Sequence, residues 1–352
     1  MAFQIDFLPV GNGERSGDCI AFRIIDPVSQ EQKVFVIDGG FKDTADELIE
    51  LINKYYGTNK VDFVISSHPD EDHISGLHVI LDKMEVDNLI MHLPWEHAQD
   101  INSKIKNNIS NSTLESKLEK NLRLASCLED LAKEKNKDIK IIEPFAGLDI
   151  FNGLVRVLGP SKAYYEELLP HFDEEIEPKK DLSFLGMSKK VVDAIVKWVQ
   201  DHPLINLLDD EDTTSIKNNS STVILLQDDN KKVLFTADIG KRGLERAIDF
   251  AKTVDINLSD LYLMDVPHHG SKRNFGKTAM SNIGATYACI SASKNAEKHP
   301  AKKVTNHLNK MGVQWTTTKD GGKCFTSSDI FGNREGWSSI AFDTTFHPQV
   351  EE

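Results

Sequence analysis

The fold is decided by the stretch Ser66-Ser67-His68-Pro69-Asp70-Glu71-Asp72-His73. It follows a short apolar run at residues 61–65 and precedes an apolar helical pattern at residues 74–81. The potential metal ligands crowded at this strand-to-helix junction are His68, Asp70, Asp72 and His73. Such a junction projects side chains from a rigid edge at the close spacing that metal ions require. An acidic loop without function is the plainer alternative, but two imidazoles interleaved with carboxylates after a buried strand argue against it.

The composition is that of a globular protein. At 352 residues, 39% of them apolar, the chain can bury a sizeable core. No apolar run approaches the roughly 20 residues needed to cross a bilayer. The N-terminus has no basic region followed by an apolar stretch, so no signal peptide is visible. The four cysteines are scattered singly, which indicates neither a thiolate zinc site nor a disulfide framework. We therefore expect a soluble, cytoplasmic protein without membrane contact.

Charge is distributed unevenly along the chain. The formal net charge of −14 argues against a surface that coats nucleic acid generally. Residues 164–216 hold 13 Asp and Glu against 5 Lys. Residues 271–303, in contrast, hold 7 Lys and Arg against a single acid, Glu297. This basic segment is a candidate anion-binding face, and a solvated loop is the alternative.

Apolar patterning predicts two β-rich halves within one domain spanning residues 1–352. Strands are expected in the first half at residues 4–9, 19–25, 33–37, 61–65, 88–91, 138–143 and 154–158. In the second half they are expected at residues 222–226, 232–235, 261–266, 286–291 and 313–318, with 337–342 a candidate last strand. Residues 95–137 and about 160–216, the latter with a helix at 188–200, are interpreted as helical insertions. A separate domain is the alternative for them.

Further potential ligands follow other predicted strands, namely Asp38, Asp238, His268, His269 and His299. Each alone is more often a cap or turn former, but together with the opening stretch they form a pattern. Two divalent ions about 3.5–4 Å apart can share a bridging carboxylate and a hydroxide that attacks the substrate. His68 and Asp70 can face one ion, and Asp72 and His73 the other. Asp238 is then the natural bridge, one of His268 and His269 completes the second ion's shell, and Asp38 orients a ligand or a nearby turn.

Several of these segments together resemble the metallo-β-lactamase fold, whose usual motif is HxHxDH. The segments are Val36-Ile37-Asp38-Gly39-Gly40, Ser67–His73, Asn218-Asn219-Ser220-Ser221, Phe235-Thr236-Ala237-Asp238, Val266-Pro267-His268-His269-Gly270-Ser271 and the run from Ile290 to Pro300, with Gly17-Asp18-Cys19 an earlier match. The chain most closely resembles the hydrolase domain of ComEC-type DNA-uptake proteins and their stand-alone relatives. The resemblance implies an α/β fold, an αββα sandwich interrupted by the helical insertions.

The chain departs from the common motif in two places. Asp70 stands where most members have histidine, and Asn218–Ser221 stands in place of their third histidine. The resulting ligand set, His68, Asp70, Asp72, His73, Asp238, His268 and His269, is rich in oxygen. Oxygen ligands favour harder ions, so Mn²⁺ or Mg²⁺ becomes as suitable as Zn²⁺ for the two divalent positions.

The resemblance implies a metal-dependent hydrolase, a phosphodiesterase or nuclease acting on nucleic acid or a nucleotide. Asp72 and His299 are the predicted catalytic residues. Side chains expected to contact substrate or support the ligands are Asp38, Asn219, Ser221, Ser271, Lys272 and Asn295, with Arg273, Lys294 and Lys298 available to flanking phosphates. A protein partner, for instance in a defence system, is expected at the helical insertions. The alternatives are a hydrolase of a lactone or lactam and a non-catalytic partner-binding protein.

Overall fold

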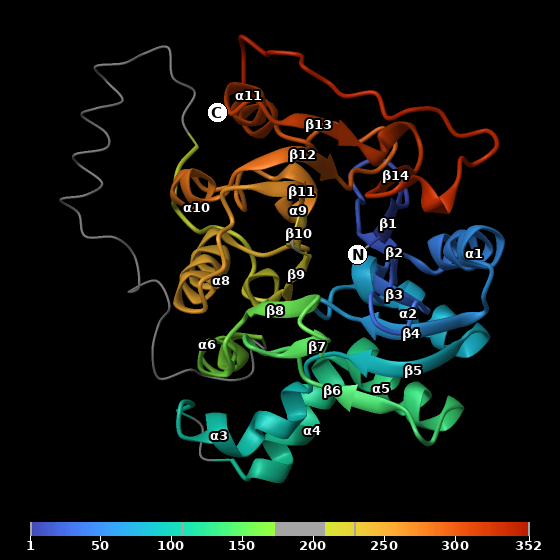
Figure 1. The fold of residues 1–352 in the computed structure, drawn as a ribbon. Coiled ribbons are helices and arrows are strands. Elements are labelled where there is room, and N and C mark those ends of the chain that lie inside the picture. The colour runs from blue at the N-terminus through green and yellow to red at the C-terminus, as the bar shows by residue number, and fades with distance from the viewer. Residues whose placement is uncertain (1, 107–108, 173–207, 229, 351–352) are drawn as a thin grey trace, which may run out of the picture.

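The strands form two sheets that pack face to face (Figure 1). The computed structural model of the chain describes residues 2–106, 109–172, 208–228 and 230–350. Within these residues the first sheet has the strand order β14-β1-β2-β3-β4-β5-β6 and the second the order β13-β12-β11-β10-β9-β8-β7. Helices cover the outer face of each sheet, so the αββα sandwich predicted from the sequence is confirmed.

In the first sheet, antiparallel strands give way to parallel ones at β3. Its strands are β1 (Ala2–Phe7), β2 (Cys19–Ile25), β3 (Gln32–Gly39), β4 (Lys60–Ile65), β5 (Glu85–Ile90), β6 (Lys140–Ile142) and β14 (Lys323–Thr326). β14, β1, β2 and β3 pair antiparallel, whereas β3 to β6 are parallel neighbours. The carboxyl ends of β3 and β4 therefore reach the same edge, and they carry Asp38 and the opening stretch there.

The second sheet repeats this arrangement. Its strands are β7 (Asp149–Phe151), β8 (Val155–Gly159), β9 (Val223–Gln227), β10 (Lys232–Phe235), β11 (Leu261–Asp265), β12 (Ala285–Ile290) and β13 (Gln314–Thr317). β7 to β10 pair antiparallel and β10 to β13 parallel. The carboxyl ends of three of these strands are followed by potential ligands: β10 by Asp238, β11 by His268 and His269, and β12 by His299. Carboxyl ends of parallel strands are the usual edge for a ligand site.

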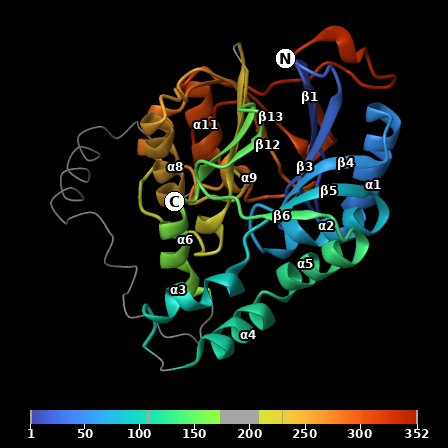
Figure 2. The same ribbon diagram turned by 60° about the horizontal axis from the view of Figure 1, so that its bottom comes forward.

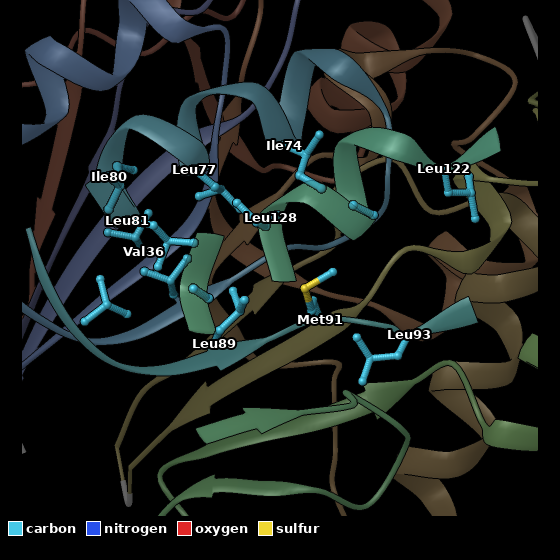
Figure 3. Packing of buried hydrophobic residues seen from close by; sticks show 14 of the residues in the cluster. Val36, Ile74, Leu77, Ile80, Leu81, Leu89, Met91, Leu93, Leu122 and Leu128 are labelled. Carbon is cyan, nitrogen blue, oxygen red and sulfur yellow. The ribbon is translucent and has the colours of Figure 1, made fainter. Parts of the chain in front are cut away.

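Three apolar layers hold the sandwich together. Between the sheets, the stacked rings of Phe22, Phe35 and Phe235 form the centre, with Phe22 4.5 Å from Phe35 and 5.4 Å from Phe235 between ring centroids. α1 (Lys42–Leu51), α2 (Glu71–Lys83) and α5 (Arg123–Lys135) cover the first sheet. Figure 3 shows Leu77 and Leu81 of α2 facing the β strands. α8 (Lys241–Thr253), α10 (Lys277–Asn282) and α11 (Lys302–Lys310) cover the second.

A pair of glycines sets α2, and with it the opening stretch, against β3. A Cβ at Gly76 would lie 2.0 Å from the carbonyl oxygen of Gly39, and one at Gly39 would lie 2.5 Å from the amide nitrogen of Leu77. Only glycine allows this approach, and the amide of Gly76 uses it to donate a 2.9 Å hydrogen bond to the Gly40 carbonyl. The helix that begins within the opening stretch is thereby fixed to β3, which carries Asp38 near its end.

Of the segments interpreted as insertions, the first contributes α5 to the helical layer that covers the first sheet. Residues 95–137 contain α3 (Ala98–Asn102), α4 (Asn111–Asn121) and α5, preceded by a short 3₁₀ turn at Pro94–His97. α6 (Lys162–Leu168) begins the second segment and contacts α3, as Figure 2 shows. The helix predicted at 188–200 lies outside the described residues.

Two details of the C-terminal region differ from the sequence interpretation. Residues 337–342 are not a strand; an isolated bridge to Trp315 forms only at the next residue, Asp343. The last strand is β14, which the alternation missed because its four residues are bounded by turns and only Phe325 in it is fully buried. Among the described residues, no helix has the length and apolar character needed to span a membrane.

Candidate metal centre

The carboxylate of Asp238 lies at the centre of four imidazoles. Its Oδ1 is 3.5 Å from Nε2 of His73 and 3.5 Å from Nε2 of His269. Its Oδ2 is 3.4 Å from Nε2 of His268 and 4.0 Å from Nε2 of His68. The two oxygens therefore face two different pairs of ring nitrogens. Each pair combines one histidine of the opening stretch with one histidine of the loop after β11.

Each half of this arrangement has a further carboxylate. Asp70 Oδ2 is 3.7 Å from His68 Nε2, and Asp72 Oδ2 is 3.9 Å from His73 Nε2. One half thus contains His68, Asp70 and His268 around Asp238 Oδ2. The other contains Asp72, His73 and His269 around Asp238 Oδ1. The pairing of His68 with Asp70 and of Asp72 with His73 is the one expected from the sequence, and both His268 and His269 reach the centre, one in each half.

Several atoms at this centre are in the state that metal ligands would have. Among the described residues, Nε2 of His68, His73 and His269 and Oδ1 of Asp238 are buried without a hydrogen-bond partner. Buried polar atoms are normally satisfied, so four unsatisfied atoms facing one another need an explanation. A divalent cation supplies it, because imidazole nitrogen and carboxylate oxygen are its usual protein ligands. The residues present fit such a group.

Charge leads to the same conclusion. Burial opposes ionisation of Asp238, but His268, His269 and His73 hold its pKa well below the ordinary value. Burial likewise opposes a charge on His73, yet Asp238, Asp72 and Asp38 raise its pKa well above the ordinary value. Burial raises the pKa of Asp72 and lowers that of His269 to about 3. Crowded carboxylates therefore draw a proton onto His73, and a bound cation would take over that compensating role.

Asp38 orients His73 from behind. Its Oδ2 lies 2.8 Å from Nδ1 of His73, and its Oδ1 accepts a 2.8 Å hydrogen bond from the amide of Ser67. The Ser67 hydroxyl also donates to Asp38 Oδ2 at 2.5 Å. With Nδ1 engaged, His73 presents Nε2 to the centre, which is the orienting action expected of a carboxylate behind a ligand histidine.

His268 is held by an amide from the basic segment. Asn274 Nδ2 donates to the carbonyl oxygens of Asp238 and Ile239 at 2.9 and 3.2 Å, so its Oδ1 faces Nδ1 of His268 at 2.9 Å. A proton on Nδ1 would satisfy this oxygen and present Nε2 to the centre, whereas an unprotonated Nδ1 would accept from a donor. Asn218 Nδ2 also lies 3.2 Å from Nδ1 of His268. Sequence reasoning missed Asn274 and Asn218, whose amides carry no motif signal of their own.

Backbone strain is concentrated around the centre. Non-glycine residues with positive φ include Asp38 at 53°, Ala237 at 45°, His268 at 47° and His269 at 57°. Two consecutive left-handed histidines are unfavourable, since each such residue costs about 1–3 kcal/mol. The conformation directs both imidazoles toward Asp238. Strain of this kind is typical of functional sites.

Asp18 is a second buried carboxylate that the sequence interpretation did not count as a site residue. It precedes β2, and its Oδ1 and Oδ2 lie 3.7 Å from Nδ1 of His269 and 3.8 Å from Nδ1 of His73. Burial raises its pKa to about 7. Because Nδ1 of His269 has no other partner among the described residues, Asp18 is placed to orient it. Gly17-Asp18-Cys19, a carboxylate directly before a buried strand, was the available signal.

The other residues predicted to contact substrate or support the ligands lie at different distances from Asp238. Asn219 accepts from the amide of Gly243 at 3.4 Å and so lies against α8 rather than at the centre. Ser271 is buried, and its hydroxyl accepts from the amide of Arg273 at 3.2 Å within its own turn. Ser221 is fully buried with a hydroxyl that has no partner among the described residues. Lys272 is half-buried, and Asn295 Nδ2 donates to Asn12 at 3.1 Å, away from the metal ligands.

A small pocket opens over the centre. It has a volume of about 270 Å³ and is lined by Glu14, Arg15, Ser16, Phe41, Glu71, Asp72, His268, His269 and His299. His299 stacks on His268 with ring centroids 5.8 Å apart. Burial, with His268 nearby, lowers the pKa of His299 to about 4, so its ring is neutral at neutral pH. A neutral ring accepts a proton or hydrogen bond more readily than it protonates a leaving group.

Comparisons with known proteins identify the fold. Residues 14–100 match the model of the metallo-beta-lactamase superfamily. A search of curated proteins found no relative of the chain. Among solved structures, the metallo-beta-lactamase fold protein YhfI from Bacillus subtilis is 9% identical, with 93% of this chain and all (100%) of that one covered and a TM-score of 0.47.

Two further structures are comparably similar. Zn²⁺-bound PqqB from Methylobacterium extorquens is 9% identical, covering 92% of this chain and 99% of its own, with a TM-score of 0.43. A diphosphatase from the PhnP family is 10% identical, covering 93% and 99%, with a TM-score of 0.40. Likeness at this level assigns no activity. The family match and the two sheets with flanking helices establish the metallo-β-lactamase fold.

Proposed function

We propose that the chain is a metal-dependent phosphodiesterase acting on nucleic acid or a nucleotide. The observation that carries the proposal is the shared carboxylate of Asp238, whose oxygens face two separate sets of ligands, each containing one further carboxylate. Two divalent ions on such a set would polarise a phosphoryl group and activate water. The oxygen-rich ligands suit Mn²⁺ or Mg²⁺ as well as Zn²⁺.

The residues around the pocket complement a phosphate. Asp70, Asp72 and Asp238 would hold the ions with the four histidines, while the guanidinium of Arg15 at the pocket wall matches a substrate anion. Of the two acids beside Arg15, Glu14 is engaged elsewhere, since it accepts from the amide of Glu297 at 3.1 Å. Glu71 pairs with Arg15 itself at 3.4 Å, and both side chains of that pair are exposed. His299 Nδ1 is buried without a hydrogen-bond partner among the residues that the structure describes, so this neutral ring can accept a hydrogen bond from substrate or water in the pocket.

The resemblance to ComEC-type hydrolase domains supports a nucleic-acid substrate within this proposal. It rests on the sequence segments that replace the usual histidines with Asp70 and with Asn218–Ser221. In the structure, His268 occupies the half of the centre where the third histidine is missing. A partner protein at α3, α4 and the acidic segment remains part of the proposal, to be tested by co-purification of deletion variants.

The proposal is tested by assaying purified protein with Mn²⁺, Mg²⁺ or Zn²⁺ on bis-p-nitrophenyl phosphate and on a chromogenic β-lactam. Phosphodiester hydrolysis that is lost in Asp72→Ala is the expected result. Hydrolysis of the β-lactam alone would instead indicate a hydrolase of esters or amides. Failure of both reactions, together with absence of bound metal by elemental analysis, would support a non-catalytic binding protein.

A further inference from the structure

A groove much larger than the metal pocket adjoins it. The groove has a volume of about 1390 Å³ and shares Arg15, Phe41 and Glu71 with the pocket over the metal centre, whose volume is about 270 Å³. Pockets for one small molecule usually measure about 300–1,000 Å³. The small pocket is therefore of a size for the reacting group alone, and the groove can hold a substrate that extends well beyond it.

Two loops tied together build one wall of the groove. The amide of Gly13 donates to the Lys294 carbonyl at 2.7 Å, and the amide of Ser293 donates to the Ser16 hydroxyl at 3.0 Å. Asn295 Nδ2 donates to Asn12 Oδ1 at 3.1 Å, and Asn295 is itself held at a φ of 64°. The wall is thus ordered by direct hydrogen bonds between residues from opposite ends of the chain, and Lys294 and Asn295 lie on it.

The lining combines three kinds of contact. Its cations are Arg15, Lys42, Lys294 and Lys319, and its carboxylates are Asp43, Glu47, Glu71 and Asp320. Asn12 and Asn295 add amides, and Phe41 adds an aromatic ring. Because the carboxylates offset the cations, charge alone does not favour a polyanion here. An occupant must also offer hydrogen-bonding edges and flat rings, which a single nucleic-acid strand exposes and a duplex hides in its stack.

Arg15 stands at the passage between the pocket and the groove. Its guanidinium carbon lies 4.5 Å from the centroid of the Phe41 ring, which it covers. Among the described residues it forms an ion pair with Glu71, at 3.4 Å, and the two side chains are 67% and 66% exposed. Because so exposed a pair is screened by solvent and contributes little, Arg15 can leave the ring at little cost. A base can then stack on Phe41 while the guanidinium contacts the adjoining phosphate.

We propose, on the basis of the proposed phosphodiesterase function, that this groove binds the single-stranded nucleic acid on one side of the scissile bond. Arg15 and Phe41 are the specificity-determining residues at the first position beyond the metal centre. The substrate is then a strand of several nucleotides rather than a free nucleotide or a duplex.

The test compares wild type, Arg15→Ala and Phe41→Ala, with Arg123→Ala as the matched control, since the exposed Arg123 of α5 lines neither cavity. Fluorescence anisotropy in EDTA measures binding of a labelled single-stranded oligonucleotide of about 10 nucleotides. Each groove variant is expected to raise its dissociation constant about 10-fold, as the loss of one base stack predicts. In Phe41→Ala, which keeps the guanidinium at the pocket wall, the ratio of kcat/KM for the oligonucleotide to that for bis-p-nitrophenyl phosphate should fall by a similar factor. Arg123→Ala should change neither quantity.

Unchanged oligonucleotide binding and an unchanged kcat/KM ratio in both groove variants would overturn the inference, as would a duplex that binds as tightly as the single strand. Cleavage of bis-p-nitrophenyl phosphate without cleavage of the oligonucleotide would overturn the groove inference and leave the proposed phosphodiesterase intact. If the protein cleaved neither the oligonucleotide nor bis-p-nitrophenyl phosphate with Mn²⁺, Mg²⁺ or Zn²⁺, the proposed phosphodiesterase function would be wrong. The groove inference, which rests on it, would then be wrong as well.

Discussion

Two clusters of histidine and carboxylate side chains lie in this molecule, and they differ in one decisive respect. Around Asp238, ring nitrogens of three histidines are buried without hydrogen-bond partners among the described residues. In the second cluster, His97 is equally buried, but its Nε2 lies 2.9 Å from Glu143 and its Nδ1 lies 3.3 Å from Glu166. Both nitrogens therefore donate, and the ring must carry a proton on each.

Charge in the second cluster is balanced by the protein itself. Lys104 and Lys162 pair with Glu166 at 3.3 and 3.6 Å, and Lys162 pairs with Asp100 at 3.2 Å. Asp100, Glu166 and His97 lie close enough to hold an ion, yet no ring nitrogen remains available for one. Composition and proximity are therefore the same in the two clusters, and the difference between them is that ring nitrogens around the shared carboxylate of Asp238 are left unpaired among the described residues.

The largest expected effect is that of Asp238→Asn. This variant keeps the shape of the side chain but removes the charge that both halves of the centre share. We expect hydrolysis of bis-p-nitrophenyl phosphate to fall by about 1000-fold or more, together with loss of metal measured by elemental analysis after dialysis. Glu143→Gln, the corresponding change in the second cluster, should retain both. Full metal content in Asp238→Asn would contradict the assignment of the centre.

His97→Gln should act on stability instead. Removing the imidazolium leaves Glu143 and Glu166 partly buried without their central donor, so the free energy of unfolding should drop by about 3 kcal/mol. Chemical denaturation measures it, with His78→Gln on α2 as a control, because the half-buried ring of His78 lies 3.3 Å from a backbone carbonyl, that of Ile74, rather than between two carboxylates. Bound metal should stay at the wild-type level. A loss of metal without a loss of stability would reverse the roles given to the two clusters.

The sequence could predict the metal centre better than the cluster at His97, for a physical reason. Ligands that follow parallel strands converge because the carboxyl ends of those strands share an edge, so His68, Asp238 and His269 could be placed together from apolar patterning alone. His97 and Glu166 meet only through the packing of α3 on α6. That packing depends on loop lengths and helix orientation, which periodicity does not encode.

Adjacent residues mark the other limit. No sequence pattern distinguishes Asn218 from its neighbour Asn219. Both lie in one 3₁₀ turn, yet the side chain of Asn218 faces His268 and that of Asn219 faces α8. Alternation likewise located the loop after β11 but left open which of His268 and His269 is a ligand. Two successive left-handed residues turn both inward, and this conformation cannot be inferred from residue type because histidine rarely adopts it.

Asp18→Asn should produce a smaller change at the metal centre. The amide keeps the volume of the side chain but weakens its ability to accept a proton from Nδ1 of His269. Carboxylates behind ligand histidines affect metal affinity by about 10- to 100-fold, and the 3.7 Å separation suggests the lower end of that range. Competition with a chromogenic chelator measures the affinity. Asp26→Asn, in the turn after β2, serves as the control, and equal affinities in the two variants would remove Asp18 from the site.

The smallest expected effect is a pH dependence confined to the second cluster. Burial opposes the charge on His97, but the hydrogen bonds that its ring donates to Glu143 and Glu166 outweigh burial and raise its pKa. In the unfolded chain the pKa of histidine is about 6.5. The stabilisation is therefore complete below that value and is lost as pH rises through the higher pKa of the folded state. The difference in unfolding free energy between wild type and His97→Gln should be larger at about pH 5.5 than at about pH 9. A difference that is constant, or that grows with pH, would show that His97 is not held as a cation between its two glutamates.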